Sequence, residues 1–436
     1  MNTIAPLESE KSLGIGEEMY RMIEGLYPLC RSITGDGFRQ TMRRIQEVIP
    51  LSIHEVPTGT DVFDWTIPKE WNVRDAYVKG PTGKKIIDFK QHNLHLLQYS
   101  LPLHRRMPLQ ELKQHLYSLP DHPEWIPYRT SYYKENWGFC LSHRQLVSLE
   151  EGEYEVVIDS TLENGQLTYG EFRIQGESDE EVLLSCHCCH PSLCNDNLSG
   201  IALTSHLAGI LKGQALRYSY RFLFIPGAIG SITWLAKNEA LASWIKHGLV
   251  VTGVGDPGQF HYKKSRRGDT EIDRVVQYVL KHSGKQHHVR DFSPYGYDER
   301  QYCSPGFNLA VGSLTRSQHG MYPQYHTSAD NLDFVSKAAL AESLSVYLDV
   351  VRVLETNRYY LNLNPKCEVR LGKRGLYRTM GGDAVQPLNE LALLWVLNLS
   401  DGINSLLDIS ERSGLPFNDV STAAQALLEK DLLKSA

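Results

Sequence analysis

Four side chains that lie far apart along the chain are of the types that bind zinc. His187 ends the apolar run EVLLSCH, and Asp196 follows it nine positions later, directly before a run with a helical pattern. Asp256 ends the run LVVTGVGD, and His326 lies in the polar stretch YPQYHTSADN. Zinc accepts imidazole nitrogens and carboxylate oxygens as ligands. The four residues therefore predict a metal site, provided that the fold brings them together.

Each of these residues also has an ordinary structural interpretation. Asp196 is a good helix N-cap, and an aspartate before Pro-Gly, such as Asp256, usually belongs to a turn. A single histidine in a tyrosine-rich loop, such as His326, usually has a structural role. The metal interpretation is favoured because all four residues follow predicted strands of one sheet. In parallel sheets, ligands gather at the carboxyl ends of the strands.

The run HCCHPSLC adds further candidate ligands. His190 stands three positions after His187, but Pro191 turns the chain directly after it, so a metal contact and a substrate contact both stay open for His190. Cys186 and Cys188 flank His187, so within a strand both point to the face opposite this histidine. A zinc site made of cysteines alone is therefore disfavoured, and most of these thiols are expected to pack in the core.

The elements that must position these side chains alternate between strand and helix. Apolar runs of strand length are separated by stretches with the helical spacing of apolar residues. This alternation predicts an α/β fold with a mostly parallel sheet that helices cover on both faces. The expected strands are residues 181–187, 217–227, 249–256 and 307–315, and the expected helices are residues 198–213, 231–248, 270–284 and 337–357.

Changes in composition divide the chain into three predicted domains. Residues 1–50, with two helical stretches around a Gly-rich break, join residues 156–360 in the α/β domain. Residues 51–155, rich in Pro, Trp, Tyr and His, are expected to form a small β-rich insert. Residues 361–436 contain three short helical stretches with the spacing of a winged-helix or helix-turn-helix unit.

Several motifs together resemble a known group of bacterial proteins. The chain carries RSITGDG, DWTIPKEWNV, HCCHPSLCNDNLSG, YHTSADN and LGKRGLY, and through them it resembles proteins with an aminopeptidase-like domain, often found with polysaccharide biosynthesis functions. Their core is similar to zinc aminopeptidases and glutaminyl cyclases. The resemblance implies a zinc-exopeptidase-like three-layer sandwich, a protease-associated-like insert and a C-terminal winged helix. It also implies zinc as the cofactor, with Asp196 as the bridging ligand beside His187, Asp256 and His326.

The sequence departs from the aminopeptidase pattern at two places. Cys189 stands where that pattern has an aspartate that orients the first histidine, and FLFIPGAIGS lacks the Glu-Glu pair that supplies the general base and a ligand of the second metal. A single metal is therefore expected rather than two. Glu299, in YGYDERQY, is the candidate replacement base, and Asp298 is a candidate ligand or orienting group. A solvated acidic loop is the alternative for this pair.

Four residues are predicted to contact the substrate. Arg266 lies in KKSRRGD, and a guanidinium there suits a carboxylate or phosphate, with a solvated basic loop as the alternative. The other three are close in sequence to the expected metal and base residues. They are His190, Tyr297 and Asp298.

Composition and charge exclude several kinds of partner. The formal net charge of −6 provides no general attraction for nucleic acid or anionic membranes, and no apolar run approaches the length of a membrane span. The N-terminal residues lack the pattern of an export signal, which favours the cytoplasm. Residues 388–436 contain three basic and seven acidic residues. The C-terminal domain is therefore expected to make protein contacts, such as those of a homo-oligomer, rather than to bind DNA.

These observations favour a metal-dependent hydrolase that acts on an amide or peptide-like bond of a small molecule. Two alternatives stay open. The same scaffold would serve a cyclase or acyl transferase in which a substrate amine attacks. The missing Glu-Glu pair also keeps open a non-catalytic protein that retains a metal or ligand pocket and acts through its C-terminal domain.

Overall fold

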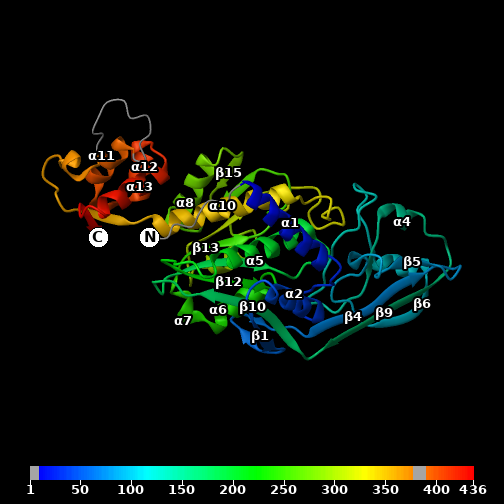
Figure 1. The fold of residues 1–436 in the computed structure, drawn as a ribbon. Coiled ribbons are helices and arrows are strands. Elements are labelled where there is room, and N and C mark those ends of the chain that lie inside the picture. The colour runs from blue at the N-terminus through cyan, green and yellow to red at the C-terminus, as the bar shows by residue number, and fades with distance from the viewer. Residues whose placement is uncertain (1–8, 377–388) are drawn as a thin grey trace. The chain divides into compact units, whose positions relative to one another are not determined.

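A computed structural model describes residues 9–376 and 389–436. The chain forms two compact units, of which the first ends at Leu348 and the second starts at Asp349. This boundary lies inside the long helix α10 (Lys337–Thr356). Figure 1 gives the positions of the labelled elements within each unit.

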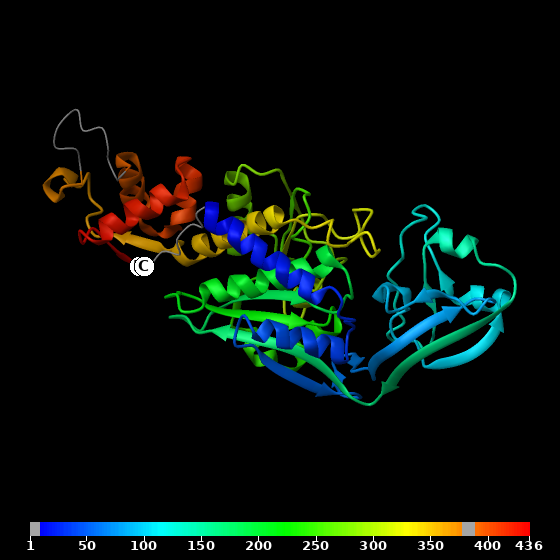
Figure 2. The ribbon, with the colours of Figure 1, turned by 45° about the vertical axis from the view of Figure 1, so that its right-hand side comes forward.

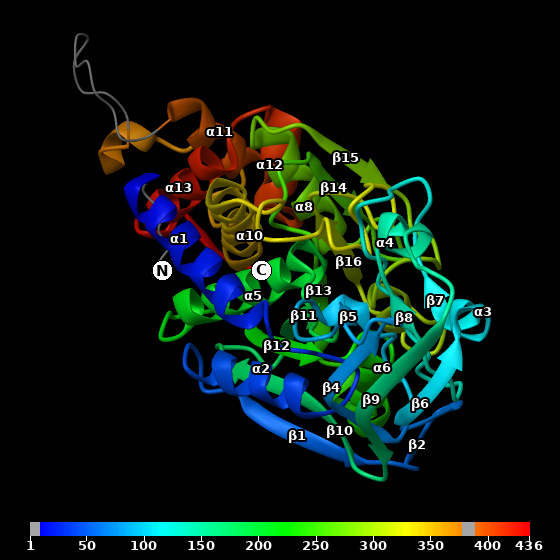
Figure 3. The ribbon, with the colours of Figure 1, turned by 90° about the vertical axis from the view of Figure 1, so that its right-hand side faces the viewer.

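An eight-stranded sheet forms the centre of the first unit. Its strand order is β1-β10-β12-β11-β13-β16-β14-β15. Strands β12, β11, β13 and β16 run parallel to one another, whereas β1, β10 and β14 pair antiparallel with their neighbours toward the centre (Figure 3). The mostly parallel sheet predicted from the sequence is therefore confirmed. The strands are β1 (Ser52–Pro57), β10 (Gln166–Ile174), β11 (Glu181–His187), β12 (Ser219–Ile225), β13 (Ile245–Val251), β14 (Phe260–Lys263), β15 (His287–Arg290) and β16 (Val311–Thr315).

Helices cover both faces of this sheet. Helix α5 (Ser199–Leu211) connects β11 to β12. Helix α6 (Ile229–Lys237) and the short α7 (Glu239–Ala242) connect β12 to β13, which is the opposite direction across the sheet. Because such crossovers are right-handed, connections in opposite directions place their helices on opposite faces, as Figure 1 shows for α5 and α6. Helices α1 (Ser9–Leu26) and α2 (Asp36–Gln46) lie beside this layered core (Figure 2), and α8 (Glu271–His282) packs on the strands from β13 to β15.

One predicted helix is wrong over its second half. Residues 231–248 were expected to be helical up to Gly248, but the helical turns end at Ala242 and β13 begins at Ile245. Six of the seven residues of β13 are buried, as expected for a central strand covered on both faces. A Cβ atom at Gly248 would lie 2.9 Å from Val311 Cγ2, so this glycine permits close packing between strands instead of ending a helix.

A second, four-stranded sheet lies between Glu70 and Glu163. Its order is β5-β4-β9-β6, and all pairs are antiparallel. Strands β9 and β10 follow each other directly but belong to different sheets, and β1, within the segment 51–155, pairs in the eight-stranded sheet. The strands of the smaller sheet are β4 (Glu70–Lys79), β5 (Lys85–Asp88), β6 (Leu103–Pro108) and β9 (Glu153–Glu163).

The C-terminal unit contains the three predicted short helices. They are α11 (Glu390–Leu399), α12 (Leu406–Ser413) and α13 (Phe417–Leu428), and their buried apolar faces pack together. A three-stranded sheet of order β18-β17-β19 completes the unit, with β17 (Tyr359–Asn362), β18 (Asp401–Ser405) and β19 (Leu433–Ser435). None of the helices in the described ranges is long and apolar enough to cross a membrane.

Candidate metal centre

Three of the four predicted ligands lie together, because His187 and His326 both contact the Asp196 carboxylate. His187 is the last residue of β11, and Asp196 lies in the turn Cys194–Leu198 that leads into α5. His187 Nε2 lies 2.7 Å from Asp196 Oδ1, and His326 Nε2 lies 3.0 Å from Asp196 Oδ2. Asp196 and His187 are buried, whereas the His326 side chain is one-third exposed. The Asp196 carboxylate is thus shared by two imidazoles that are far apart in sequence.

A buried network fixes the turn that carries Asp196. The Asp330 carboxylate accepts hydrogen bonds from the backbone N–H groups of Asn195 (2.6 Å) and Asp196 (2.9 Å). The Asn197 amide donates to the carbonyls of His187 (3.2 Å) and Val251 (3.0 Å), which end two neighbouring strands. Burial raises the pKa of Asp330 to about 8. Sequence reasoning missed Asp330, although it lies within the quoted motif YHTSADN.

His190 joins the same group. Its Nδ1 lies 3.7 Å from Asp196 Oδ1, and its ring centroid is 4.9 Å from that of His187 and 5.0 Å from that of His326. Nδ1 is buried and has no hydrogen-bond partner in the described part of the chain. Burial lowers the pKa of His190 well below its usual value, which favours the neutral imidazole. A neutral imidazole with an unshared buried nitrogen is a metal-ligand arrangement.

Burial and the neighbouring carboxylate act against each other at His187. Burial opposes the charged form, but the negative charge of Asp196 and the hydrogen bond to it outweigh burial and raise the pKa of His187. The ligand atoms of His187, His190 and Asp196 all lie within 4.8 Å of one another, which is close enough for one metal ion. The donor set, two nitrogens and a carboxylate oxygen with His326 beside them, fits zinc.

Two residues that sequence reasoning missed hold the histidines in place. Arg31 is fully buried, and its Nε (3.0 Å) and Nη2 (2.8 Å) both donate to the His190 carbonyl, while Nη1 donates to Leu26 O (2.6 Å). Tyr128 N–H donates to the His326 carbonyl (2.8 Å), and the Tyr128 ring lies 5.1 Å edge-on from the rings of both His190 and His326. Arg31 stands in the quoted motif RSITGDG, whereas no signal in the sequence marks Tyr128.

Asp256, the fourth predicted ligand, lies outside this group. Strand β13 ends at Val251, so Asp256 is not the strand-end residue that the sequence indicated. Its carboxylate accepts hydrogen bonds from Gly258 N, Asn195 Nδ2 and both N and Oγ of Ser317, at 2.6 to 3.2 Å. Both oxygens are therefore engaged in fixing surrounding loops.

Tyr297 lies against the histidine group. Its ring stacks on the His187 ring at 5.4 Å, with 20° between the planes. Burial raises the pKa of the Tyr297 phenol well above its usual value, and Thr252, the first residue after β13, lies close to this hydroxyl. The predicted substrate residue Tyr297 therefore borders the site, as does His190.

Asp298 and Glu299 occupy different positions despite being neighbours. Asp298 Oδ1 accepts hydrogen bonds from Ala228 N (2.8 Å) and Ser231 Oγ (2.7 Å) at the start of α6, which is where FLFIPGAIGS lacks the Glu-Glu pair. Glu299 is buried, and its Oε1 pairs with Lys263 Nζ. Its Oε2 is buried with no hydrogen-bond partner among residues 9–376 and 389–436. This environment does not match the solvated acidic loop that was the alternative for this pair.

The cysteines of the HCCH run are buried thiols. Cys186 and Cys188 are fully buried, as expected for core residues on the face opposite His187. The Cys189 sulfur accepts a hydrogen bond from Gly227 N (3.2 Å), and burial raises the pKa of Cys189 to about 12. A neutral thiol is a poor zinc ligand.

Arg266, which the sequence suggested as a substrate residue, is exposed and donates to Asn308 Oδ1 (2.9 Å).

Comparisons with known proteins agree with this architecture. The family model described as "Domain of unknown function (DUF4910)" matches residues 20–357, and a model described as a winged helix-turn-helix matches residues 358–435. A Clostridium acetobutylicum protein, provisionally named a polysaccharide biosynthesis protein with aminopeptidase-like domain, is 56% identical over 425 residues, which are 98% of each chain.

Several solved structures are also similar to this chain. A crystal structure of a Clostridium acetobutylicum protein, provisionally described as a peptidase, is 54% identical, covers 98% of each chain and has a TM-score of 0.93. A zinc aminopeptidase from Bacillus subtilis is 13% identical with a TM-score of 0.56, over 77% of this chain and 94% of that chain. A Peptidase M28 precursor from Shewanella amazonensis has the same identity and TM-score, over 83% and 99%.

The aminopeptidase-like fold and the C-terminal winged helix expected from the sequence are thereby confirmed. The two aminopeptidase-type structures are too distant in sequence to show more than the fold. The chain belongs to the family described as a domain of unknown function, DUF4910, and carries it together with a C-terminal winged helix-turn-helix domain.

Proposed function

We propose that the protein is a metal-dependent hydrolase that cleaves an amide or peptide-like bond in a small molecule or short peptide. One observation carries this proposal: His187 and His190 of one run and His326 of a distant loop converge on the buried Asp196 carboxylate. The buried His190 Nδ1, which has no partner in the described ranges, supports a ligand at this position. The aminopeptidase-like fold supports the reaction class.

The group that would hold zinc consists of His187, His190, Asp196 and His326. Zinc supplies Lewis-acid polarisation of a carbonyl and lowers the pKa of water. Asp196 contributes the single carboxylate of the set. Three other nearby carboxylates are engaged in the hydrogen bonds described above, which favours one metal over two. They are Asp256, Asp298 and Asp330.

Glu299 is the proposed general base. The Lys263 ammonium balances the charge of the carboxylate at Oε1, and Tyr297 N–H donates to the same oxygen (3.2 Å). The other oxygen, Oε2, is buried and available as a proton acceptor. Asp298 positions this segment by anchoring it to the first turn of α6. Tyr297 closes one side of the site against His187 and excludes water there.

Metal content and turnover test the proposal separately. Zinc-loaded protein is dialysed and its metal measured by mass spectrometry, for the natural chain, His187→Ala, Asp196→Ala and the control His104→Ala. His104 has a 73% exposed side chain on β6 and serves as the matched histidine. We expect about one zinc per chain in the natural protein and His104→Ala, and none in the other two. Absence of a stoichiometric ion from the natural protein would refute the metal site.

Turnover is then assayed on aminoacyl and dipeptide amides. Glu299→Gln is expected to retain zinc while kcat falls by about 10²- to 10⁴-fold, the usual contribution of a general base. Product analysis in ¹⁸O-labelled water distinguishes hydrolysis from cyclisation or acyl transfer, because only hydrolysis incorporates the label. Zinc binding without turnover of any amide would favour the non-catalytic alternative.

A further inference from the structure

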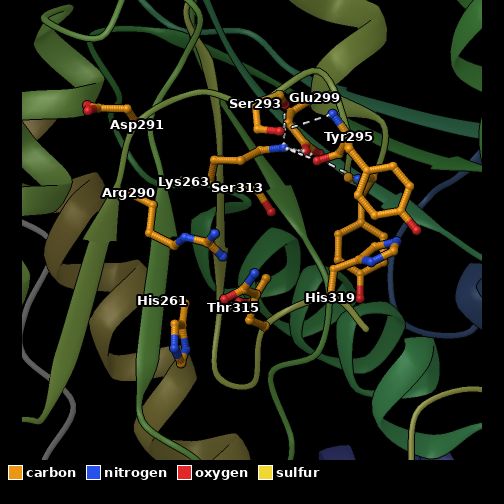
Figure 4. A pocket seen from close by; sticks show the side chains of 13 residues that line it. His261, Lys263, Arg290, Asp291, Ser293, Tyr295, Glu299, Ser313, Thr315 and His319 are labelled. Carbon is orange, nitrogen blue, oxygen red and sulfur yellow. Dashed lines mark hydrogen bonds and ion pairs between the residues drawn. The ribbon is translucent and has the colours of Figure 1, made fainter. Parts of the chain in front are cut away.

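A pocket lined by charged, hydroxyl and aromatic side chains (Figure 4) lies beside the proposed metal centre, because it shares Tyr297 with that centre. Its volume is about 120 Å³. Its walls come from β14, β15 and β16, from the loop before the short helix α9 (Glu299–Tyr302), and from the loop that follows β16. On the three strands, the lining side chains include Lys263, Arg290, Ser313 and Thr315.

Strand register places these side chains together. Lys263 is opposite Arg290 on one side and opposite Ser313 on the other, so the three form one row across β15, β14 and β16. Thr315 lies in the adjacent row of the same face, opposite His261. Residues two apart on a strand share a face, and Figure 4 shows all of these side chains around one space. The row is therefore a consequence of the sheet and does not depend on a loop conformation.

Most charges of the pocket are compensated. Lys263 Nζ pairs with Glu299 and donates to the carbonyls of Ser293 and Tyr295, each at 3.0 Å. Asp291 pairs with Lys264 at 3.0 Å. Together these two ion pairs leave no net charge.

Three hydrogen-bond donors in the pocket are free. Within the described ranges, the Arg290 guanidinium has neither a hydrogen bond nor an ion pair, and the hydroxyls of Ser313 and Thr315 have no hydrogen-bond partner. A guanidinium with adjacent hydroxyl donors matches the oxygens of a carboxylate or phosphate. Arg290, which is exposed, is thus the lining cation without an ion-pair partner in the described ranges, and with the two hydroxyls it forms an arrangement of donors suited to an oxyanion.

One aromatic layer separates the pocket from the histidine group. Tyr297 and His319 line the pocket, and their rings lie 4.6 Å apart. Tyr297 stacks on His187, as described above. His319 contacts Tyr325 at 5.1 Å, and Tyr325 in turn stacks on His326 at 3.9 Å. A small molecule with one end in the pocket would have its next bonds near the histidines.

We infer that this pocket binds an oxyanion carried by the substrate, a carboxylate or a phosphate group, so that the substrates are acidic amides. The inference rests on the proposed function for the reaction, but the pocket itself does not depend on it. A cavity of about 150 Å³ holds a benzene molecule, so the volume of about 120 Å³ accommodates an acidic side chain.

Ligand binding to the full-length protein tests the pocket without turnover. Isothermal titration compares the α-amides of N-acetylglutamate and N-acetylglutamine, which differ only in the charge of the side chain. The natural protein should bind the glutamate compound at least about tenfold more tightly, as expected for a charge-assisted contact worth 1.4 kcal/mol or more. Arg290→Gln should remove this preference. Arg43→Gln, an exposed arginine on α2, is the matched control and should retain it.

Two further measurements separate the possible outcomes. The α-amide of N-acetyl-O-phosphoserine replaces the carboxylate by a phosphate and identifies which oxyanion binds more tightly. Ser313→Ala should weaken binding of the preferred oxyanion without abolishing it, because the guanidinium remains. Equal affinity for the glutamate and glutamine compounds, or a preference that survives in Arg290→Gln, would overturn the inference. Binding with the expected preference but without hydrolysis would refute only the proposed function.

Discussion

The ion pair between Arg39 and Glu70 gives the most quantitative prediction. Arg39, on α2, donates to both oxygens of Glu70 at 2.7 Å, and the two side chains are 18% and 12% exposed. Glu70 also accepts the Gln166 N–H at 2.8 Å. The pair therefore connects α2 with the first residues of β4 and β10, where the chain passes between the two sheets of the first unit. We predict that Glu70→Gln destabilises this unit.

The size of the effect follows from the pKa of Glu70. The hydrogen bonds and charge of Arg39 lower this pKa from 4.5 to about 2. Each pKa unit corresponds to 1.36 kcal/mol, so ionised Glu70 contributes at most about 3 kcal/mol to the free energy of unfolding at pH 7. Because the folded pKa is the lower one, this contribution is present above the pKa of the unfolded chain and is lost as the pH falls through the folded value. At pH 3 it should be roughly half as large.

Urea unfolding of Arg39→Met, Glu70→Gln and the double variant measures the pair directly. We expect a coupling free energy of about 1 to 3 kcal/mol at pH 7, because Glu55 remains as a partner of Arg39 in Glu70→Gln. The pair Arg44 and Glu47, on the surface and 3.2 Å apart, is the control and should give a value near zero. A coupling below about 0.5 kcal/mol for the first pair, or one that does not decrease at pH 3, would refute the reasoning.

Two other predictions concern the metal group and the C-terminal domain. Arg31→Lys removes the paired donation to the His190 carbonyl, so zinc affinity, measured by competition with a chelator, should fall by about 10- to 100-fold. The melting temperatures of the two metal-free proteins are compared to measure any effect of the substitution on folding. An unchanged zinc affinity would contradict the role of Arg31 in positioning His190. Helix α13, the second helix of the helix-turn-helix, contains Asp419 and no Lys or Arg, so a mixed-sequence DNA duplex in about 0.15 M salt should not shift in a gel with up to about 1 µM protein. A shift that weakens steeply with salt would contradict this.

The sequence predicted the elements of the fold better than their ends. Helix α8 has a strong amphipathic periodicity, whereas β11 and α5 were predicted from apolar runs of strand and helix length, and the structure confirms all three. The failure at residues 243–248 has a tertiary cause. No Pro and no earlier Gly marks the end of a helix in the run ALASWIKHG, and pairing with the neighbouring strands β11 and β16 determines that this segment is a strand. Tertiary contacts of this kind leave no mark in local periodicity.

Candidate residues that follow strands could be selected from the sequence. His187 ends a buried strand and Asp196 lies in the turn before a helix, and the structure brings these two candidates together. Asp256 was selected by the same rule, but β13 ends five residues earlier, so the rule gave a residue of a structural loop. Arg31 acts through the His190 carbonyl, 159 residues away in sequence, and Tyr128 acts through the His326 carbonyl, which is also distant in sequence. Such contacts follow only from the folded chain.

The charges of the metal group and of the pocket support the same class of substrate. In the proposed metal site, a dication held by neutral histidines and the single carboxylate of Asp196 would retain a net charge of about +1. Arg31 adds a buried positive charge that faces carbonyls and no carboxylate among the described residues. Arg290 supplies another positive charge in the adjacent pocket. A site with this balance is suited to acidic amides and poorly suited to cationic peptides.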